Sequence, residues 1–357
     1  MVDTGRLPHA LLIEGPSGSG KFALARATAQ YLHCSARTAD GEPCGVCPAC
    51  LQHQGFNHID TVFSFPVYKK GGSSALSSDF QRDFCDFVSE SPFMDYGQWL
   101  ERIADANAQP RIYVEEGEQL IRRLGFTAHG ARYKVVLLWL PERMMEQTAN
   151  KLLKLIEEPA DDTRLILVSN DPRGILPTIY SRTQRITVSR YTNREIQEYL
   201  MRARGVTDGA AAEASRLAEG DMNRALGLLA HTSRPDSVRL DMFIQLMRLA
   251  YMRDIVALRT WGNNLAASGR EAMTAFFDYA ARMLRENYIY ALRVPQLNCM
   301  TPEEEQFSSR FSRFVNERNI EDLMRVMDEA RVDVAANANG KIVCFDVAIK
   351  MILLLKR

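Results

Sequence analysis

The sequence lacks three features that would point to particular classes of protein. It has no excess of basic residues, because 44 Lys and Arg residues balance 44 Asp and Glu residues. This balance argues against a protein that binds nucleic acid through a generally basic surface, but it does not exclude a local basic groove. It contains no apolar run near the ~20 residues that span a bilayer. Its first residues show no apolar segment followed by a cleavage site, so no export signal is visible. We therefore expect a cytoplasmic protein without membrane contact.

A phosphate-binding loop is present, but it lacks one of its usual side chains. The segment GPSGSGKF fits the pattern G-x-x-x-x-G-K-[ST] except at the last position, where a phenylalanine replaces the hydroxyl that ligates Mg²⁺. An apolar run precedes the loop and a helical pattern follows it, which is the context that a phosphate-binding loop requires. The alternative is a glycine-rich turn with an incidental lysine. The candidate nucleotide-binding residues of the loop are Gly15, Gly18, Gly20, Lys21 and Phe22.

The acidic side chains that hydrolysis requires are also missing. An acid at the end of a neighbouring strand normally helps to hold Mg²⁺, and a further polar group orients the attacking water. The apolar segment YKVVLLWL is the candidate strand, and it ends at Trp139 and Leu140. Glu142 follows a proline, and we expect it to point elsewhere. With Phe22, three polar positions are lost together, which predicts a site that no longer hydrolyses nucleotide; the alternative is that the acidic strand is a different one.

Four of the seven cysteines form a cluster with the spacing C-x9-C-x2-C-x2-C. In a reducing compartment such a cluster binds metal more often than it forms disulfides. Four thiolates can surround Zn²⁺ as a tetrahedron with no open position, which predicts a structural metal. The nearby His33 and His53 are possible substitutes that four sulfurs do not need. The predicted zinc ligands are Cys34, Cys44, Cys47 and Cys50.

Hydrophobic periodicity divides the chain into an α/β part and a helical part. Buried strands and amphipathic helices alternate up to about residue 190, which predicts a parallel sheet covered by helices. Only helical patterns follow, and Thr232–Ser237 reads as a linker between them. A segment from about 63 to 110 looks like an insertion. Its aromatic residues at helical spacing are predicted to pack a local helical cluster rather than to stack on bases.

Several motifs together resemble a known family. RLPHALLIEGPSGSGK, the cysteine cluster, ANKLLKLIEEP, LILVSNDPRGILPTIYSRTQ and GDMNRAL occur in the order seen in bacterial clamp-loader subunits, the AAA+-type proteins of the DNA polymerase III holoenzyme. The resemblance covers roughly residues 6–59 and 111–231 and is only architectural beyond them. It implies an AAA+-type P-loop domain over 1–190 with a zinc module at 34–50, a small helical lid over 191–235 and an all-α collar over 236–357.

The resemblance also implies roles for individual residues. In this family the gamma/tau subunits hydrolyse ATP, whereas the delta-prime subunit has a degenerate site, and the losses at Trp139 and Leu140 resemble delta-prime. The segment SRT matches the family's Ser-Arg-Cys motif and makes Arg182 the candidate arginine finger, which would act in the ATP site of a neighbouring subunit. Asn170 and Arg224 match the two sensor positions, and without a metal site we expect both to be vestigial or structural.

The partners that the resemblance implies are the other clamp-loader subunits, of gamma/tau and delta type, together with the sliding clamp and primed DNA. The expected function is that of a non-hydrolysing subunit that assembles into the loader ring. Binding of ATP or ADP is left open. The resemblance implies a segment before the first motif that helps to hold adenine, and this sequence starts almost at the motif. A misassigned start, a trimmed chain and a missing adenine contact are the alternatives, and each counts against binding. The alternative is an active ATPase of gamma/tau type, which the retained Lys21, Asn170 and Arg224 favour.

Overall fold

The computed structural model describes residues 7–69, 75–103, 108–125, 130–159, 162–230, 234–294 and 297–356. The chain folds into two compact units, Met1–Thr192 with Gly220–Asn223, and Asn193–Glu219 with Arg224–Arg357. We describe each unit by itself. The predicted separation of a lid over 191–235 from a collar over 236–357 stays a prediction. Within the described ranges, no helix is both long and apolar enough to cross a membrane.

The first unit contains a five-stranded parallel sheet with the order β2-β3-β4-β1-β5. The three inner strands are almost wholly buried, which explains why their sequences are apolar on both faces. All strands end at the same edge of the sheet, where Glu14 lies beside Ser169 and Trp139 beside Val168. The strands are β1 (Ala10–Glu14), β2 (Thr61–Ser64), β3 (Lys134–Trp139), β4 (Thr163–Ser169) and β5 (Gln184–Thr187).

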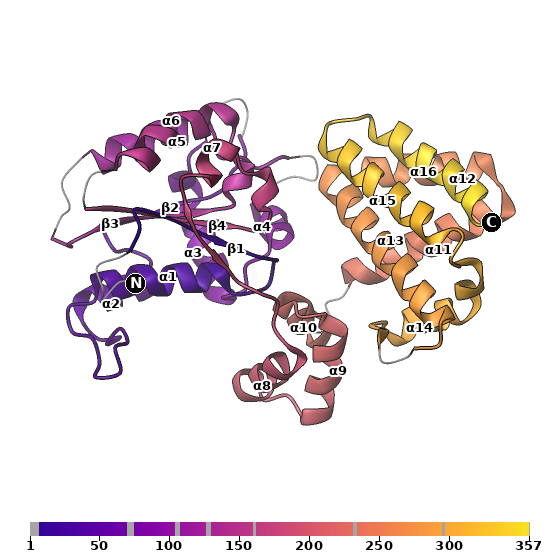
Figure 1. Ribbon diagram of the computed structural model, residues 1–357, viewed down its shortest axis with the longest axis horizontal. Helices are drawn as coiled ribbons and strands as arrows, with labels where there is room; N and C mark the ends of the chain where they lie inside the picture. Colours follow the sequence, from indigo (N-terminus) through magenta and orange to yellow (C-terminus); the bar gives the residue numbers. More distant parts are fainter. Residues whose placement is uncertain are drawn as a thin grey trace. The chain divides into compact units, whose positions relative to one another are not determined.

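Helices cover both faces of this sheet, and Figure 1 shows α5 and α6 on one face and α1 on the other. Each face has its own apolar core. The first face carries α1 (Lys21–His33), α3 (Gln81–Glu90) and α4 (Tyr96–Ile103), and the second carries α5 (Val114–Leu124), α6 (Glu146–Glu157) and α7 (Pro177–Tyr180). The shorter elements of this unit are α2 (Pro48–Gln54), η1 (Ser77–Phe80), η2 (Pro141–Arg143) and η3 (Pro172–Gly174). The predicted P-loop α/β fold is confirmed.

The segment predicted as an insertion contributes to the main core of this unit. Its predicted start at about residue 63 falls inside β2, so the boundary was placed too early. Phe84 and Trp99 are almost completely buried, and Phe84 lies 6.0 Å from the ring of Trp139 on β3. The aromatic residues therefore pack, as expected, but against the sheet rather than only among themselves. Periodicity revealed their helical spacing and could not reveal which surface they cover.

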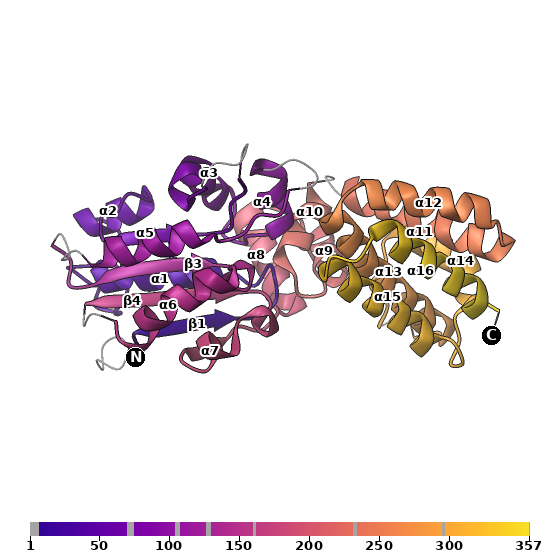
Figure 2. The same ribbon diagram turned by 90° about the horizontal axis from the view of Figure 1, so that it is seen from above.

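The second unit is entirely helical in its described part, and its largest core lies among α11 to α16. Figure 2 shows α12 and α16 running side by side. The linker predicted at Thr232–Ser237 is wrong from Arg234 onward, because α11 begins there, and Thr232 and Ser233 lie outside the described residues. The elements are α8 (Asn193–Arg204), α9 (Asp208–Ala218), α10 (Met222–Leu229), α11 (Arg234–Met252), α12 (Ile255–Ala267), α13 (Arg270–Ala291), α14 (Pro302–Phe311), η5 (Ser312–Phe314), α15 (Ile320–Ala335) and α16 (Gly340–Leu354).

Candidate functional site

The phosphate-binding loop lies between β1 and α1, and its own chain packs closely over it. Gly18 has a φ of 73°, and a Cβ atom at this position would lie 1.9 Å from Oδ1 of Asp221. Gly20 has a φ of 75°, and its Cβ would lie 2.7 Å from the hydroxyl of Tyr191. The ring of Tyr191 in turn meets Phe93 edge to face at 5.9 Å. A carboxylate and two aromatic rings therefore lie against a loop whose usual ligand is an anion.

Lys21 is buried and turned back onto the loop. Its Nζ donates hydrogen bonds to the carbonyl oxygen of Pro16 and, at 3.2 Å, to Oγ of Ser19. Burial lowers the pKa of Lys21 to about 8, while the charges of Glu142 and Asp221 act in the opposite direction. Lys21 therefore still carries its charge at pH 7, and that charge is directed to groups of its own chain.

The lowered pKa of Lys21 predicts a specific pH dependence. The folded state binds this proton less tightly than the unfolded state, whose lysine has the ordinary pKa of 10.5. Between about pH 8 and 10.5 the unfolded state therefore holds more protons, and the free energy of unfolding rises with pH. We expect urea unfolding to show that the free energy of unfolding of the natural chain rises between pH 7 and pH 10, relative to that of Lys21→Met. Equal changes in both proteins would contradict the burial of a charged Lys21.

Phe22 and Trp139 belong to one aromatic cluster. Phe22 is 3% exposed and meets the ring of Phe84 edge to face at 5.6 Å. Trp139, at the end of β3, lies 6.0 Å from the same ring and 6.1 Å from that of Phe87. The two positions predicted to lack their magnesium-binding groups are therefore joined through α3 in the apolar core.

Glu142 does not point away from this edge of the sheet, and the expectation that it would is wrong. Leu140 adopts a left-handed conformation with a φ of 58°, and the short η2 turn that follows carries Glu142 back to the end of β4. There its Oε1 accepts hydrogen bonds from the backbone N–H groups of Asn170 at 2.9 Å and Asp171 at 3.1 Å. Burial raises the pKa of Glu142, and its charge interacts with Lys21. Only the backbone conformation of Leu140, which the sequence does not signal, places this carboxylate.

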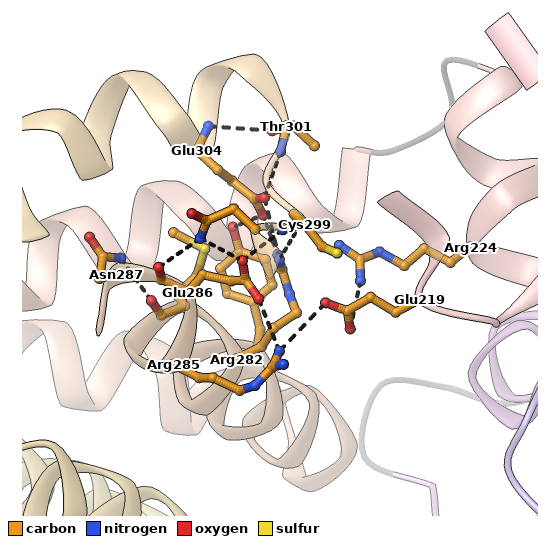
Figure 3. Close-up of polar contacts among 12 residues, drawn as sticks. Glu219, Arg224, Arg282, Arg285, Glu286, Asn287, Cys299, Thr301 and Glu304 are labelled. Atoms are coloured by element: carbon orange, nitrogen blue, oxygen red, sulfur yellow. Dashed lines mark hydrogen bonds and ion pairs between the residues drawn. The ribbon is translucent and has the colours of Figure 1, made fainter. Parts of the chain in front are cut away.

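The two predicted sensor residues lie in different units. Asn170 follows β4 at the edge of the sheet and is bound through its backbone N–H to Glu142. Arg224 lies in α10, and its guanidinium pairs with Glu219 at 3.5 Å. Figure 3 shows Glu219 between Arg224 and Arg285 of α13, which is 3.9 Å away. In the helical unit, Arg224 is thus a member of a polar network.

Arg182 is exposed at the turn between α7 and β5 and is held in place by two contacts. Its Nε lies 2.6 Å from Oε1 of Glu157 at the end of α6, and its Nη1 donates to the carbonyl oxygen of Thr178 at 3.0 Å. The side chains of Arg182 and Glu157 are each 41% exposed. The arginine predicted as a finger therefore reaches the surface with a defined orientation.

The four predicted metal ligands converge. The sulfur atoms of Cys34, Cys44, Cys47 and Cys50 all lie within 4.8 Å of one another. The S–S distance is 3.6 Å between Cys34 and Cys44 and 4.0 Å between Cys44 and Cys50. Four sulfurs at Zn–S distances of ~2.3 Å in a tetrahedron are separated by about 3.8 Å. Cys34 ends α1 and Cys47 precedes α2, so two helix ends position the cluster, which can hold a metal ion.

Three buried histidines form a second group beside the cysteines, and its ring nitrogens also lie within 4.8 Å of one another. Nε2 of His33 donates to the carbonyl oxygen of Tyr133 at 2.8 Å, so its Nδ1 accepts the hydrogen bond from Nε2 of His53, also at 2.8 Å. The ring of His58 stacks on that of His33 at 4.1 Å. Burial lowers the pKa of His33 to about 4 and that of His53 to about 3, so both are neutral at pH 7. The three histidines therefore form a packed, hydrogen-bonded group that is distinct from the four sulfurs.

A family model described as DNA polymerase III, delta subunit matches residues 1–192, the part of the chain that carries the loop, the cysteines and Arg182. The chain belongs to this DNA polymerase III family. It is 33% identical over 174 residues to the delta-prime subunit of Pseudomonas aeruginosa, which covers 49% of this chain and 41% of that protein. It is 30% identical over 182 residues to the delta-prime subunit of Haemophilus influenzae, which covers 51% and 43%. The resemblance to the delta-prime type of clamp-loader subunit is confirmed.

Gamma/tau subunits of DNA polymerase III are also similar to this chain. The gamma/tau subunit of Mycobacterium tuberculosis is 27% identical over 182 residues, which cover 51% of this chain and 24% of that protein. The chain thus spans less than half the length of each of these relatives. Among solved structures, a gamma subunit-related protein of Thermotoga maritima aligns with 98% of this chain and 95% of its own, at 14% identity and a TM-score of 0.43.

Proposed function

We propose that this chain is a non-hydrolysing, delta-prime-like clamp-loader subunit. The observation that carries the proposal is the aromatic cluster of Phe22, Phe84 and Trp139, which fills the positions from which an active subunit would coordinate magnesium. Magnesium normally neutralises the charge that develops on a transferred phosphoryl group, so a site that cannot bind the ion would not support hydrolysis. The carboxylate of Asp221 beside Gly18 adds a like charge at the place where phosphates would bind.

The catalytic contribution of the chain would then be made to a neighbour. Arg182 is exposed, so a neighbouring subunit can reach it, and its guanidinium is paired with Glu157, a contact that it would exchange for the phosphate. In the loader ring the guanidinium would enter the ATP site of an adjacent gamma/tau-type subunit and stabilise transition-state charge there. The ring, which includes a delta-type subunit, would open the sliding clamp and load it on primed DNA.

We propose zinc as the ion of the cysteine cluster, because four sulfurs with tetrahedral spacing and no open position are typical of structural zinc sites. The ion would fix the connection between α1 and α2 and would take no part in phosphate chemistry.

ATP turnover by the isolated chain, with and without Mg²⁺, tests the non-hydrolysing role. We expect no turnover above background, and the same result for Phe22→Ser, because a single hydroxyl does not restore the acid that Trp139 replaces. The substitution should lower the free energy of unfolding by about 3 kcal/mol, since it removes a buried ring. Magnesium-dependent turnover by the natural chain would instead identify a motor of gamma/tau type.

A further inference from the structure

The helical unit contains a groove that the proposed function does not use. Its cavity has a volume of about 750 Å³, and α11 and α14 supply most of its lining. The two walls follow the same chain direction along it, because Phe243 on α11 meets Phe307 on α14 at 5.8 Å and, further along, Tyr251 meets Phe314, in the η5 turn that follows α14, at 5.2 Å. The earlier residues of both walls therefore lie at one end of the groove and the later residues lie at the other.

The lining of the groove is apolar and partly aromatic. Ile244 and Met247 on α11 face it, together with Phe307 and Phe311 on α14, whose rings stack at 5.0 Å. Tyr251, which lines one end of the groove, is 65% exposed. Beyond it, Met252 at the end of α11 is 63% exposed and Val256 in the first turn of α12 is 79% exposed.

Charge is separated along the groove. Asp241 precedes Arg248 by two helical turns on α11, and Glu303 precedes Arg310 by two turns on α14, and all four line the cavity. Arg313 joins the basic end. Within the described part of the chain, none of the three arginines is paired with a carboxylate. One end thus carries Asp241 and Glu303, and the other carries three arginines that are not paired with a carboxylate, of which Arg313 lies over the ring of Phe314 at 4.9 Å. Arg224 also lines the cavity and is paired with Glu219.

From this arrangement we infer that the groove binds an amphipathic helix of another polypeptide, with its apolar face on the floor and acidic side chains at the end that meets Arg248, Arg310 and Arg313. Such helices dock in grooves through residues spaced i, i+3, i+4 and i+7. The carboxylates of Asp241 and Glu303 and the apolar floor disfavour a nucleic-acid strand, whose phosphates need positive charge along the whole path. The inference goes beyond the proposed function and does not depend on Arg182 or on ATP.

Two synthetic helical peptides with the same Leu and Phe face test this docking, one with three Glu residues in a terminal turn and the other with Lys in their place. Fluorescence anisotropy with the full chain should show saturable binding of the acidic peptide, about ten-fold tighter than that of the basic one. The double variant Arg310→Glu/Arg313→Glu, at exposed positions that the fold does not need, should reverse this order. Arg259→Glu, an exposed substitution on α12 outside the groove, should leave it unchanged.

Failure of both peptides to saturate, or equal affinity for them in the natural chain and the double variant, would overturn the inference. A single-stranded oligonucleotide is the third probe. Binding of the oligonucleotide that the double variant loses, without binding of either peptide, would assign the groove to nucleic acid instead. None of these outcomes bears on ATP turnover, so a failure here is distinguishable from a failure of the proposed function.

Discussion

Replacing Arg182 by alanine is expected to leave the chain folded and to reduce ATP turnover at the neighbouring site of the assembled loader by about 10³-fold or more. The fold should persist because the side chain is 41% exposed and its ion pair with Glu157 lies at the surface, where such pairs contribute about 0–1 kcal/mol. The turnover should fall because a fixed guanidinium stabilises charge that exists only in the transition state. Single-turnover measurements on the reconstituted loader would detect the effect.

Arg185→Ala is the matched control for this experiment. Arg185 lies on β5, three residues further on, is also exposed, and donates to the hydroxyl of Tyr180 rather than to a carboxylate. Its removal should not change the rate. Glu157→Gln should have an intermediate effect, because it keeps the guanidinium and removes the group that orients it. Identical rates for the natural loader and the Arg182→Ala loader would show that this arginine is not the finger.

Removal of the metal is the second change with a large expected effect. Purified chain should contain one zinc per molecule, and chelation or Cys47→Ser should unfold the segment between the end of α1 and the end of α2. Structural zinc contributes about 10–16 kcal/mol in isolated zinc-finger peptides, far more than the few apolar contacts of so short a segment can replace. Amide exchange should then show loss of protection there, while the helical unit, which has its own core, keeps its protection.

Cys85→Ser serves as the control for the metal experiment, because Cys85 lies on α3 outside the cluster. This variant should keep its zinc and the protection of the segment. Metal analysis that finds no zinc in protein purified without chelators would end the proposal. Zinc that survives Cys47→Ser in full would show that the four sulfurs are not the ligand set, and would direct attention to His33 and its neighbours.

Much of the α/β unit follows from local patterns. The strand before Gly15, the helix after it and the apolar run of β3 are each specified by a few neighbouring residues, and all three lie where expected. β2 was missed because it is only four residues long and merges into the segment read as an insertion. The linker at Thr232–Ser237 was misjudged because its turn-forming residues overlap the first turn of α11, and a proline is tolerated there.

The sequence by itself determined the class of the fold and singled out the four cysteines that converge and the apolar residues at Phe22 and Trp139, because each depends on residue types at fixed spacing. Only the tertiary structure decided that Phe22 and Trp139 share one partner in Phe84, that Asp221 lies against Gly18 and that Glu157 orients Arg182. These contacts join segments far apart in the chain. Their partners are set by the order of strands in the sheet and by backbone turns such as that at Leu140, which no local pattern encodes.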